Sequence, residues 1–236
     1  MTVRKTSAFA AERKKPKHGT LDFYPTPAWA TEALFEHVIP QQYRPKNELI
    51  RRLNCWEPAC GKGDMSKVLE NHFSTVISSD VKNYGFEKMN FVFNFITGNY
   101  KDLKEKMLYH KSHADWIITN PPFNLAEKFI LQALGRAIYG IAIFGRIQLL
   151  ESRDRYNHIY KYYPPAIVAP FASRVSLYEN KFEDKGGQIA FAWYVWERNY
   201  KSGAWKANAP RIVWIPPRDK TPPTQKKMFD KKDAEK

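Results

Sequence analysis

The chain has 236 residues, of which 43% are hydrophobic and 15% aromatic; this supplies a core for one domain and excludes a wholly disordered chain. Two cysteines exclude a disulfide framework, and no apolar stretch approaches the roughly 20 residues that span a bilayer. A net charge of +14 favours a polyanionic partner.

Both ends of the chain are basic and carry prolines that interrupt helices. Residues 1–20 hold six basic side chains and one acidic one, and residues 217–236 hold seven and four. We therefore expect flexible basic tails over 1–19 and 217–236, on either side of one domain at 20–216. The N-terminal tail lacks the apolar segment that directs secretion, so we expect a cytoplasmic protein that does not enter a membrane.

Inside the domain, strand-like and helix-like segments alternate. Thr26, as N-cap, and Pro27 begin a helix that ends at Pro40, and Asn124 with Glu127 resembles a capping box. The other predicted helices are 64–72, 124–137 and 151–161, and the predicted strands are 53–57, 75–80, part of 91–100, 115–119, 140–144, 166–178 and 187–197. This order predicts an open α/β sheet, and its continuous apolar strands are typical of parallel strands covered on both faces.

Open parallel sheets bind ligands at the carboxyl ends of their strands, and four features of the sequence fall there. The first is the turn at 57–63, Glu-Pro-Ala-Cys-Gly-Lys-Gly, whose small residues let the backbone approach a ligand closely. Its acid suits a ligand that presents an ammonium or a sulfonium group, as S-adenosylmethionine does. The alternative interpretation is a tight strand-to-helix turn without a ligand.

The second feature is Asp80, which ends the next strand 23 residues after Glu57. An acid at about that spacing accepts hydrogen bonds from ribose hydroxyls, although a solvated Asp at a strand end is also common. The third is Asn99 with Tyr100, where an amide can read an adenine edge and a ring can stack on it. An ordinary turn explains this pair equally well.

The strongest motif is Asn120-Pro121-Pro122-Phe123, between an apolar strand and the predicted helix at 124–137. Two prolines remove backbone donors and stiffen the turn. The amide oxygen of Asn120 and the carbonyl of Pro121 then form two acceptors for a planar NH2 group, with Phe123 to stack on its ring. Such acceptors stabilise the positive charge that grows on an adenine amine during methylation, and the base has to leave its helix to reach them.

These motifs resemble those of the class I S-adenosylmethionine-dependent methyltransferases that act on adenine N6 in DNA. Residues 57–61 are similar to the family's first motif, 120–123 to its catalytic motif, and 22–27 to the segment around the methionine end of the cofactor. The motif order is similar to the gamma arrangement over residues 20–200. The resemblance implies a Rossmann-like fold with a mostly parallel seven-stranded sheet and helices on both faces.

The resemblance also implies which residues form the site. The expected catalytic residues are Asn120, Pro121, Pro122 and Phe123. The expected cofactor contacts are Tyr24, Thr26, Pro27, Glu57, Pro58, Ala59, Cys60, Gly61, Asp80, Asn99 and Tyr100. Where the family often has Asp after the third strand, this chain has Asn99. No metal is expected, because His110 and His113 lie in a polar stretch without further ligands.

Target recognition is expected in a small segment around 146–190. Its arginines suit phosphate contacts and its tyrosines suit base stacking. The candidate nucleic-acid contacts are Arg146, Arg153, Arg155 and Arg174, among tyrosines 156, 160, 162 and 163. A solvated helix with a buried tyrosine-rich side is the alternative.

We therefore predict a small DNA adenine N6-methyltransferase that resembles solitary phage or prophage enzymes. RNA adenine is an alternative substrate, and so is the side-chain amide of glutamine in a protein, since it also presents a planar NH2. A third alternative is an inactive methyltransferase-like protein that binds nucleic acid. The recognised base sequence, the strandedness of the substrate and the oligomeric state stay open.

Overall fold

The computed structural model describes residues 24–39, 50–109, 113–177, 189–199, 202–206 and 209–217. The predicted tails at 1–19 and 217–236 lie outside these residues, apart from position 217, and so does His110. Within these ranges no helix has the length and apolar character needed to cross a membrane.

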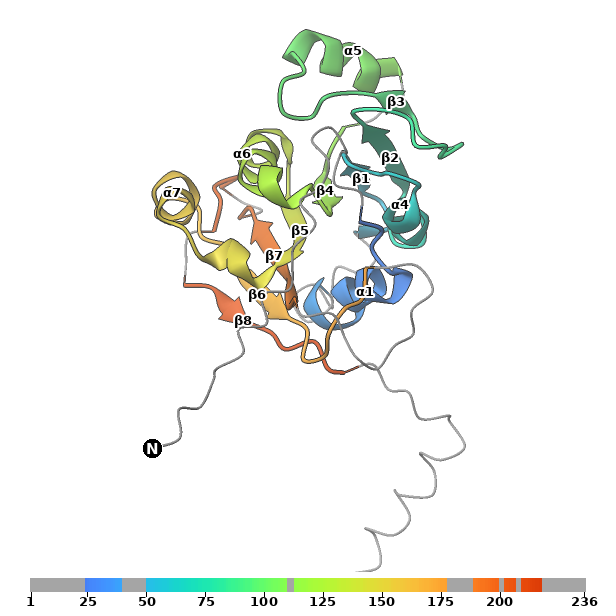
Figure 1. Cartoon of the computed structure of the whole chain (residues 1–236). Coiled ribbons are helices and arrows are strands. Elements are labelled where there is room, and N and C mark those ends of the chain that lie inside the picture. Colours follow the sequence, from blue (N-terminus) through green and yellow to red (C-terminus); the bar gives the residue numbers. More distant parts are fainter. Residues whose placement is uncertain are drawn as a thin grey trace, which may run out of the picture.

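One sheet organises the described residues, with eight strands in the order β3-β2-β1-β4-β5-β7-β6-β8 (Figure 1). The strands are β1 (Asn54–Glu57), β2 (Thr75–Asp80), β3 (Phe91–Val92), β4 (Trp116–Thr119), β5 (Gly140–Arg146), β6 (Ile167–Pro170), β7 (Phe191–Glu197) and β8 (Arg211–Ile212). From β3 to β5 all neighbours are parallel, whereas β7 runs antiparallel to both β5 and β6. The predicted mostly parallel α/β fold is confirmed.

The strand count is eight rather than the predicted seven. The additional strand, β8, lies at the edge of the sheet and consists of two exposed residues that pair in parallel with β6. It is too short to leave an apolar pattern in the sequence. The predicted strand within 91–100 is Phe91–Val92. The prediction at 166–178 was too long, because Ile167–Pro170 pair in the sheet and Phe171 adds one bridge to Ile215.

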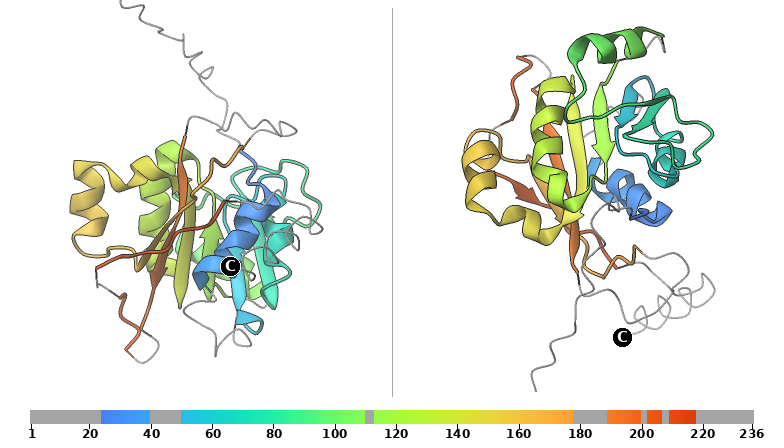
Figure 2. Two further views of the ribbon diagram at one scale, coloured as in Figure 1. Left: turned by 90° about the horizontal axis from the view of Figure 1, so that it is seen from below. Right: turned by 45° about the horizontal axis from the view of Figure 1, so that its top comes forward.

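Helices cover both faces of the sheet, as predicted. They are α1 (Ala28–Ala33), η1 (Leu34–Val38), α4 (Asp64–Leu69), α5 (Tyr100–Tyr109), η2 (Phe123–Leu125), α6 (Ala126–Arg136), η3 (Ile147–Leu150), α7 (Arg153–Arg155) and η4 (Tyr156–Tyr160). Residues of α1, η1 and α4 pack in one apolar cluster, and residues of α5, α6 and η4 pack in a second. The left-hand view of Figure 2 shows α6 and α7 on one side of the strands and α1 on the other.

Two tryptophans of β7 link the sheet to the segments that cover its two faces. Trp193 and Trp196 are almost fully buried, and they belong to opposite clusters because side chains alternate along a strand. The indole of Trp193 donates to the carbonyl of Ala30 at 2.8 Å, and that of Trp196 donates to the carbonyl of Tyr163 at 2.8 Å. Each indole therefore joins the sheet to the layer that covers it.

Two predicted helix caps were wrong. Pro27, not Thr26, precedes α1, and no side chain caps that helix. The Thr26 hydroxyl instead accepts a hydrogen bond from Asn120. The predicted box at Asn124 and Glu127 is absent because 123–125 form a 3-10 turn and Leu125 is the N-cap of α6. A tertiary contact with His158, at 2.8 Å, engages the Glu127 carboxylate instead.

The sheet order fixes where a ligand can bind. From β1 the chain proceeds to β2 on one side, whereas β4, on the other side of β1, is followed by β5 still further out. Such a switch point leaves a crevice beyond the carboxyl ends of the two central strands. Glu57, Asp80 and Asn120 end or directly follow β1, β2 and β4.

Candidate active site

The turn between β1 and α4 is shaped by two glycines in the left-handed region. Gly61 has φ of 53° and Gly63 has φ of 79°, which other residues adopt at a cost. The amide of Gly61 donates to the Asp80 carboxylate at 2.9 Å, and the amide of Cys60 donates to the carbonyl of Ser79 at 3.0 Å. The end of β2 therefore holds the turn in place.

Glu57 lies at the floor of the crevice and is 2% exposed. The Ser66 hydroxyl donates to its carboxylate, and that hydroxyl lies 2.6 Å from the hydroxyl of Ser78. Burial raises the pKa of Glu57 to about 8; Ser66 opposes the rise and the nearby Asp80 adds to it. A cation beside this carboxylate would favour its ionised form.

Asp80 is buried, and both of its carboxylate oxygens accept backbone hydrogen bonds. Oδ2 accepts from Gly61, and Oδ1 accepts from the amide of Val81 at 2.7 Å. Burial raises the pKa of Asp80, and these two hydrogen bonds oppose the rise. A carboxylate oxygen can accept more than one hydrogen bond, so Asp80 holds the turn and retains acceptor capacity for a ligand.

Asn120 has a side chain whose orientation is set by the segment before α1. Its Nδ2 donates to the carbonyl of Tyr24 at 3.0 Å and to the hydroxyl of Thr26 at 2.9 Å. A carbonyl can only accept, so the nitrogen has to face Tyr24 and the oxygen the other way. That oxygen, Oδ1, is buried and has no hydrogen-bond partner among the described residues.

A cavity of about 340 Å³ joins these groups, within the size range of small-molecule sites. Of the predicted site residues, its lining includes Tyr24, Thr26, Glu57, Pro58, Ala59, Cys60, Gly61, Asp80, Asn120 and Pro122. Burial raises the pKa of the Cys60 thiol well above its usual range, which favours the neutral thiol in the cavity wall. The structure brings together three strand ends and the Tyr24–Thr26 segment around one space.

Other predicted residues lie beside the cavity rather than in its lining. Pro27 precedes α1, and Pro121 is buried behind the turn. Phe123 packs against Tyr24, with the two rings stacked at 5.2 Å between centroids, and against Phe191 at 5.9 Å. Phe123 therefore does not line the cavity itself, but it packs against Tyr24, which does.

The side chain of Asn99, after β3, has a structural partner instead of the ligand contact predicted for it. Asn99 is exposed, and its side chain accepts from the amide of Asp102 at the start of α5, the helix that Tyr100 begins. Asn99 is not among the described residues that line the cavity. The wall is formed by the preceding residues, Phe93–Thr97, where the Asn94 side chain accepts from the amides of Ile96 and Thr97 and closes a local turn.

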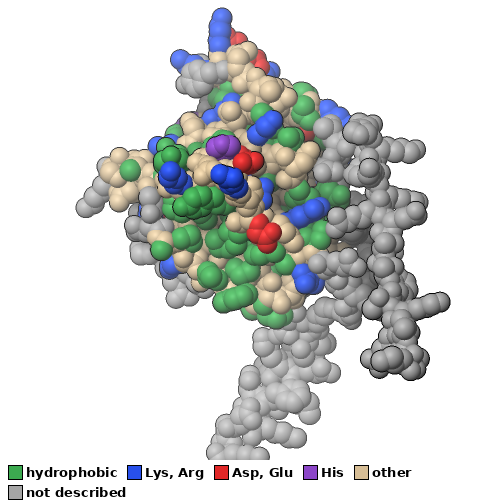
Figure 3. All heavy atoms as spheres, turned by 60° about the vertical axis from the view of Figure 1, so that its left-hand side comes forward, with side chains coloured by type: hydrophobic (Ala, Val, Ile, Leu, Met, Phe, Trp, Pro, Cys, Tyr) green, Lys and Arg blue, Asp and Glu red, His purple; other side chains and the backbone are tan. Residues whose placement is uncertain are grey.

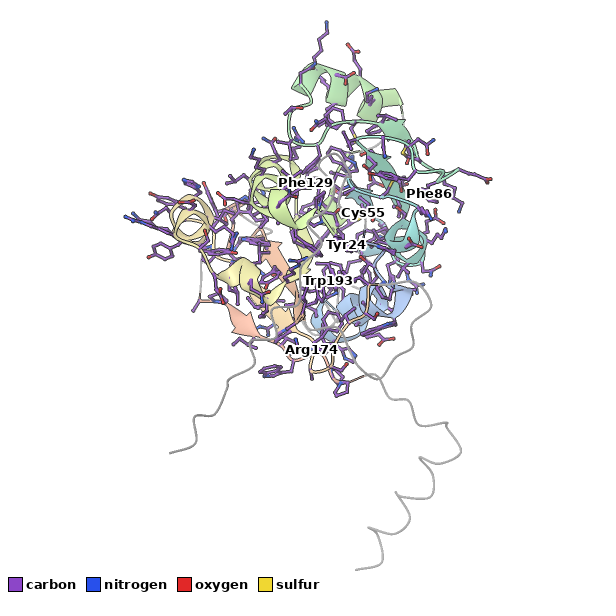
Figure 4. The ribbon with its side chains drawn as sticks, viewed as in Figure 1. Tyr24, Cys55, Phe86, Phe129, Arg174 and Trp193 are labelled. Atoms are coloured by element: carbon purple, nitrogen blue, oxygen red, sulfur yellow. The ribbon has the colours of Figure 1, made fainter. Side chains whose placement is uncertain are left out.

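Phe95 and Phe129 are wall residues that sequence reasoning missed. Their rings lie 5.0 Å apart, and the guanidinium of Arg136 lies 4.8 Å from the Phe95 centroid and donates to its carbonyl. The signal available was the alternation of phenylalanines at 91, 93 and 95, which resembled a strand. In Figure 4 Tyr24 and Phe129 lie near the centre of the molecule, where the cavity is.

The four predicted nucleic-acid arginines do not form one surface. The side chain of Arg155 donates to the carbonyls of Gln148, Leu149 and Glu151, and so closes the loop between η3 and α7. Arg174 is exposed and lies at the lower end of the molecule in Figure 4, apart from Tyr24 and Phe129. Arg153 is exposed on α7, and Arg146 lies on the ring of Phe123.

The tyrosines divide in the same way. Tyr160 donates to the carbonyl of Leu149 at 2.5 Å, and burial raises its pKa to about 12. Tyr156, Tyr162 and Tyr163 are exposed. Figure 3, which brings the α7 side of the molecule forward, shows hydrophobic side chains among scattered Lys and Arg. Within the described ranges, no group of three or more His, Cys, Asp or Glu is placed to hold a metal ion.

Comparisons with known proteins identify the fold. No protein-family model matches this chain, and no curated protein matches it. Solved structures do resemble it. A Pyrococcus horikoshii protein, provisionally described as an RNA methyltransferase, is 18% identical with a TM-score of 0.51, over 78% of this chain and 90% of that one.

Two further structures show the same similarity. A Thermoplasma acidophilum protein is 16% identical with a TM-score of 0.50, over 77% of this chain and 92% of that one. The DrdV protein, solved in complex with DNA, is 10% identical with a TM-score of 0.50, over 83% of this chain and 28% of the larger DrdV chain. At these identities the likeness shows the fold, and the chain has the Rossmann-like fold found in methyltransferases.

Proposed function

We propose that this protein transfers a methyl group from S-adenosylmethionine to the exocyclic N6 amine of adenine in DNA. One observation carries the proposal. The Asn120 carboxamide is held by Tyr24 and Thr26 with its nitrogen satisfied, and its buried oxygen has no partner in the described ranges. A buried acceptor of this kind costs free energy unless a donor arrives, and an amine on the substrate is such a donor.

The cavity suits S-adenosylmethionine in size and in chemistry. Asp80 has acceptor capacity for ribose hydroxyls, and Phe93, Phe95 and Phe129 form an apolar wall for a purine. The Glu57 carboxylate at the floor favours the cationic methionine end. When bound, S-adenosylmethionine supplies an electrophilic methyl group on a sulfonium.

The residues of the turn then act on the adenine. Asn120 Oδ1 accepts one hydrogen of the amine, and the carbonyl of Pro121 is the proposed acceptor for the other. As the nitrogen forms its new bond to the methyl carbon, the bond from that carbon to sulfur breaks and positive charge passes from sulfur to nitrogen. Fixed oxygen acceptors stabilise that charge until the methylated amine loses a proton to solvent. Positioning is the main work of the site, which requires no general base before attack.

Nucleic acid is the preferred substrate class because of charge. The chain carries 38 Lys and Arg against 24 Asp and Glu, which favours the phosphate backbone over a protein glutamine. The complete Asn120 turn and the buried Glu57 favour an active enzyme over an inactive binder. RNA adenine and protein glutamine are outcomes that the experiment separates.

The test is transfer of a labelled methyl group to matched acceptors: duplex DNA, single-stranded DNA, RNA and a glutamine-containing protein. We expect label in DNA at the N6 position of adenine. We expect none in control DNA in which unsubstituted purine, which has no exocyclic amine, replaces every adenine. Asn120→Ala should lose about a hundredfold or more in turnover with cofactor binding retained. The matched control is Asn71→Ala, which removes an exposed amide at the end of α4 and should leave turnover unchanged.

Each other result contradicts a definite part of the proposal. Label only in RNA or only in protein would replace the substrate class. Cofactor binding by calorimetry without transfer to any of the four acceptors would favour an inactive binder. Full activity in Asn120→Ala would remove the amide oxygen from the reaction.

A further inference from the structure

The side chain of Arg146 lies at the edge of the proposed target site. Arg146 ends β5, and its guanidinium carbon is 4.0 Å from the centroid of the Phe123 ring. Phe123 in turn stacks on Tyr24, which lines the cavity. Arg146 is therefore two contacts away from the cavity, on the side of the catalytic turn.

The backbone of Arg146 is held firmly by its neighbours. It is paired with Phe191 across β5 and β7, and its carbonyl accepts from the hydroxyl of Tyr194 at 2.9 Å. Tyr194 is fully buried. The start of the side chain is thus fixed by the sheet, and its position over Phe123 does not depend on a loop.

One donor of the guanidinium has no acceptor in the part of the chain that the structure describes. Its Nε is buried without a hydrogen-bond partner among those residues, and none of their carboxylates forms an ion pair with Arg146. By contrast, Arg155 donates to three backbone carbonyls. A buried cationic donor without an acceptor is unfavourable, so an anionic acceptor at this place would be stabilised strongly.

We infer that Arg146 binds the phosphate that flanks the extruded adenine, an inference that rests on the proposed function. The Phe123 ring, with its centroid 4.0 Å from the guanidinium carbon, covers one side of the group, and the N–H bonds point outward from the edge of the guanidinium plane. An acceptor has to approach that edge. A nucleotide whose base enters the catalytic turn carries a phosphate oxygen beside it, and Arg–phosphate pairs are short and charge-assisted. Arg146 thereby selects a nucleotide over an uncharged amide.

The experiment is a double-mutant cycle that measures whether the Arg146 side chain and the flanking phosphate contribute to binding together or independently. The probe is a fluorescent oligonucleotide with one adenine. Three matched oligonucleotides each carry one uncharged methylphosphonate: in place of the phosphate on the 5′ side of the adenine, on its 3′ side, or at a distant position. The proteins are the full chain, Arg146→Gln, Arg146→Lys and the control Arg52→Gln, which removes an exposed arginine before β1.

We expect Arg146→Gln to weaken binding of the natural oligonucleotide about tenfold or more, and Arg146→Lys to recover part of it. Arg52→Gln should change binding less than threefold. A methylphosphonate at one flanking phosphate should weaken binding to the full chain by a similar factor and leave Arg146→Gln almost unaffected. Such non-additivity identifies a direct partner.

Two results overturn the inference. In the first, Arg146→Gln and the methylphosphonates weaken binding by independent factors that multiply. In the second, Arg146→Gln and Arg52→Gln lose equal affinity for the natural oligonucleotide. Methyl transfer by the full chain is measured on the same oligonucleotide and tests the proposed function separately. Transfer to adenine with independent effects rejects the phosphate contact alone. Coupling without transfer to any adenine supports the contact and rejects the proposed chemistry.

Discussion

The Asn120 side chain donates a 2.9 Å hydrogen bond to the hydroxyl of Thr26, a residue 94 positions earlier in the chain. Thr26 is buried and lines the cavity, so the bond joins the segment before α1 to the turn after β4. With the Tyr24 carbonyl, it decides which end of the amide faces the site.

Thr26→Val should therefore impair turnover more than cofactor binding. Valine keeps the shape of threonine but removes the acceptor, so one donor of Asn120 is left unsatisfied and the amide can rotate. We expect a loss of about tenfold in kcat, with recovery in Thr26→Ser, which restores the hydroxyl. Steady-state kinetics gives kcat for each variant, and calorimetry gives its affinity for the cofactor. Equal turnover in the Val and Ser variants would contradict the prediction.

Cofactor affinity should rise with pH up to about 8 in the free protein. The pKa of Glu57 is raised to about 8, so near neutral pH its carboxyl holds a proton that a cationic ligand has to expel. Below that pKa, binding should release a proton and weaken as pH falls; above it, binding should be constant. Calorimetry in buffers of different ionisation enthalpy measures this proton, and Glu57→Gln should release none.

The same carboxyl should make the free protein less stable as pH rises. Its pKa in the unfolded chain is near the ordinary value for Glu, so between about pH 4.5 and 8 the native state holds more protons than the unfolded one. Stability therefore falls across that window. Thermal unfolding of Glu57→Gln should show a gain over the natural chain at pH 8 and little change at pH 5; an equal gain at both would contradict the assignment.

Gly63→Ala should destabilise the fold more than a backbone effect alone explains. An added Cβ would lie 2.4 Å from the ring of the buried Phe86, and φ there is 79°. The overpacking costs about 1–3 kcal/mol beyond the dihedral cost. Gly85→Ala is the matched control, because its φ is 88° and no atom lies within 4 Å of the added carbon. Denaturant unfolding compares the two, and equal losses would show that the clash relaxes.

Asp80→Ala should weaken cofactor binding through two routes. It removes the acceptor proposed for the ribose, and it releases the amides of Gly61 and Val81 that hold the turn. Asp80→Asn keeps one oxygen acceptor and should recover part of the affinity. We expect the alanine variant to lose about tenfold or more in affinity, with a smaller effect on the chemical step. Unchanged affinity would remove Asp80 from the site.

Local patterns were sufficient wherever neighbours in the chain determine the outcome. The β1 turn, the strand that ends at Asp80 and the Asn120 turn all carry short-range signals. Apolar or β-branched runs predict the strands, and Gly or Pro marks the turns after β1 and β4. The sheet then places these carboxyl ends together, because parallel strands present them at one edge. The sequence thus determined the fold class and the three side chains at the floor of the cavity.

The tertiary structure decided what each polar side chain does with its hydrogen bonds. Thr26 and Asn124 have the residue types of helix caps, yet Thr26 binds Asn120 and Asn124 caps nothing. Asn99 has the type of a site residue but closes the start of α5. Residue type states only which bonds a side chain can form. Its partner depends on which distant segment the fold brings within about 3 Å, and no local pattern contains that information.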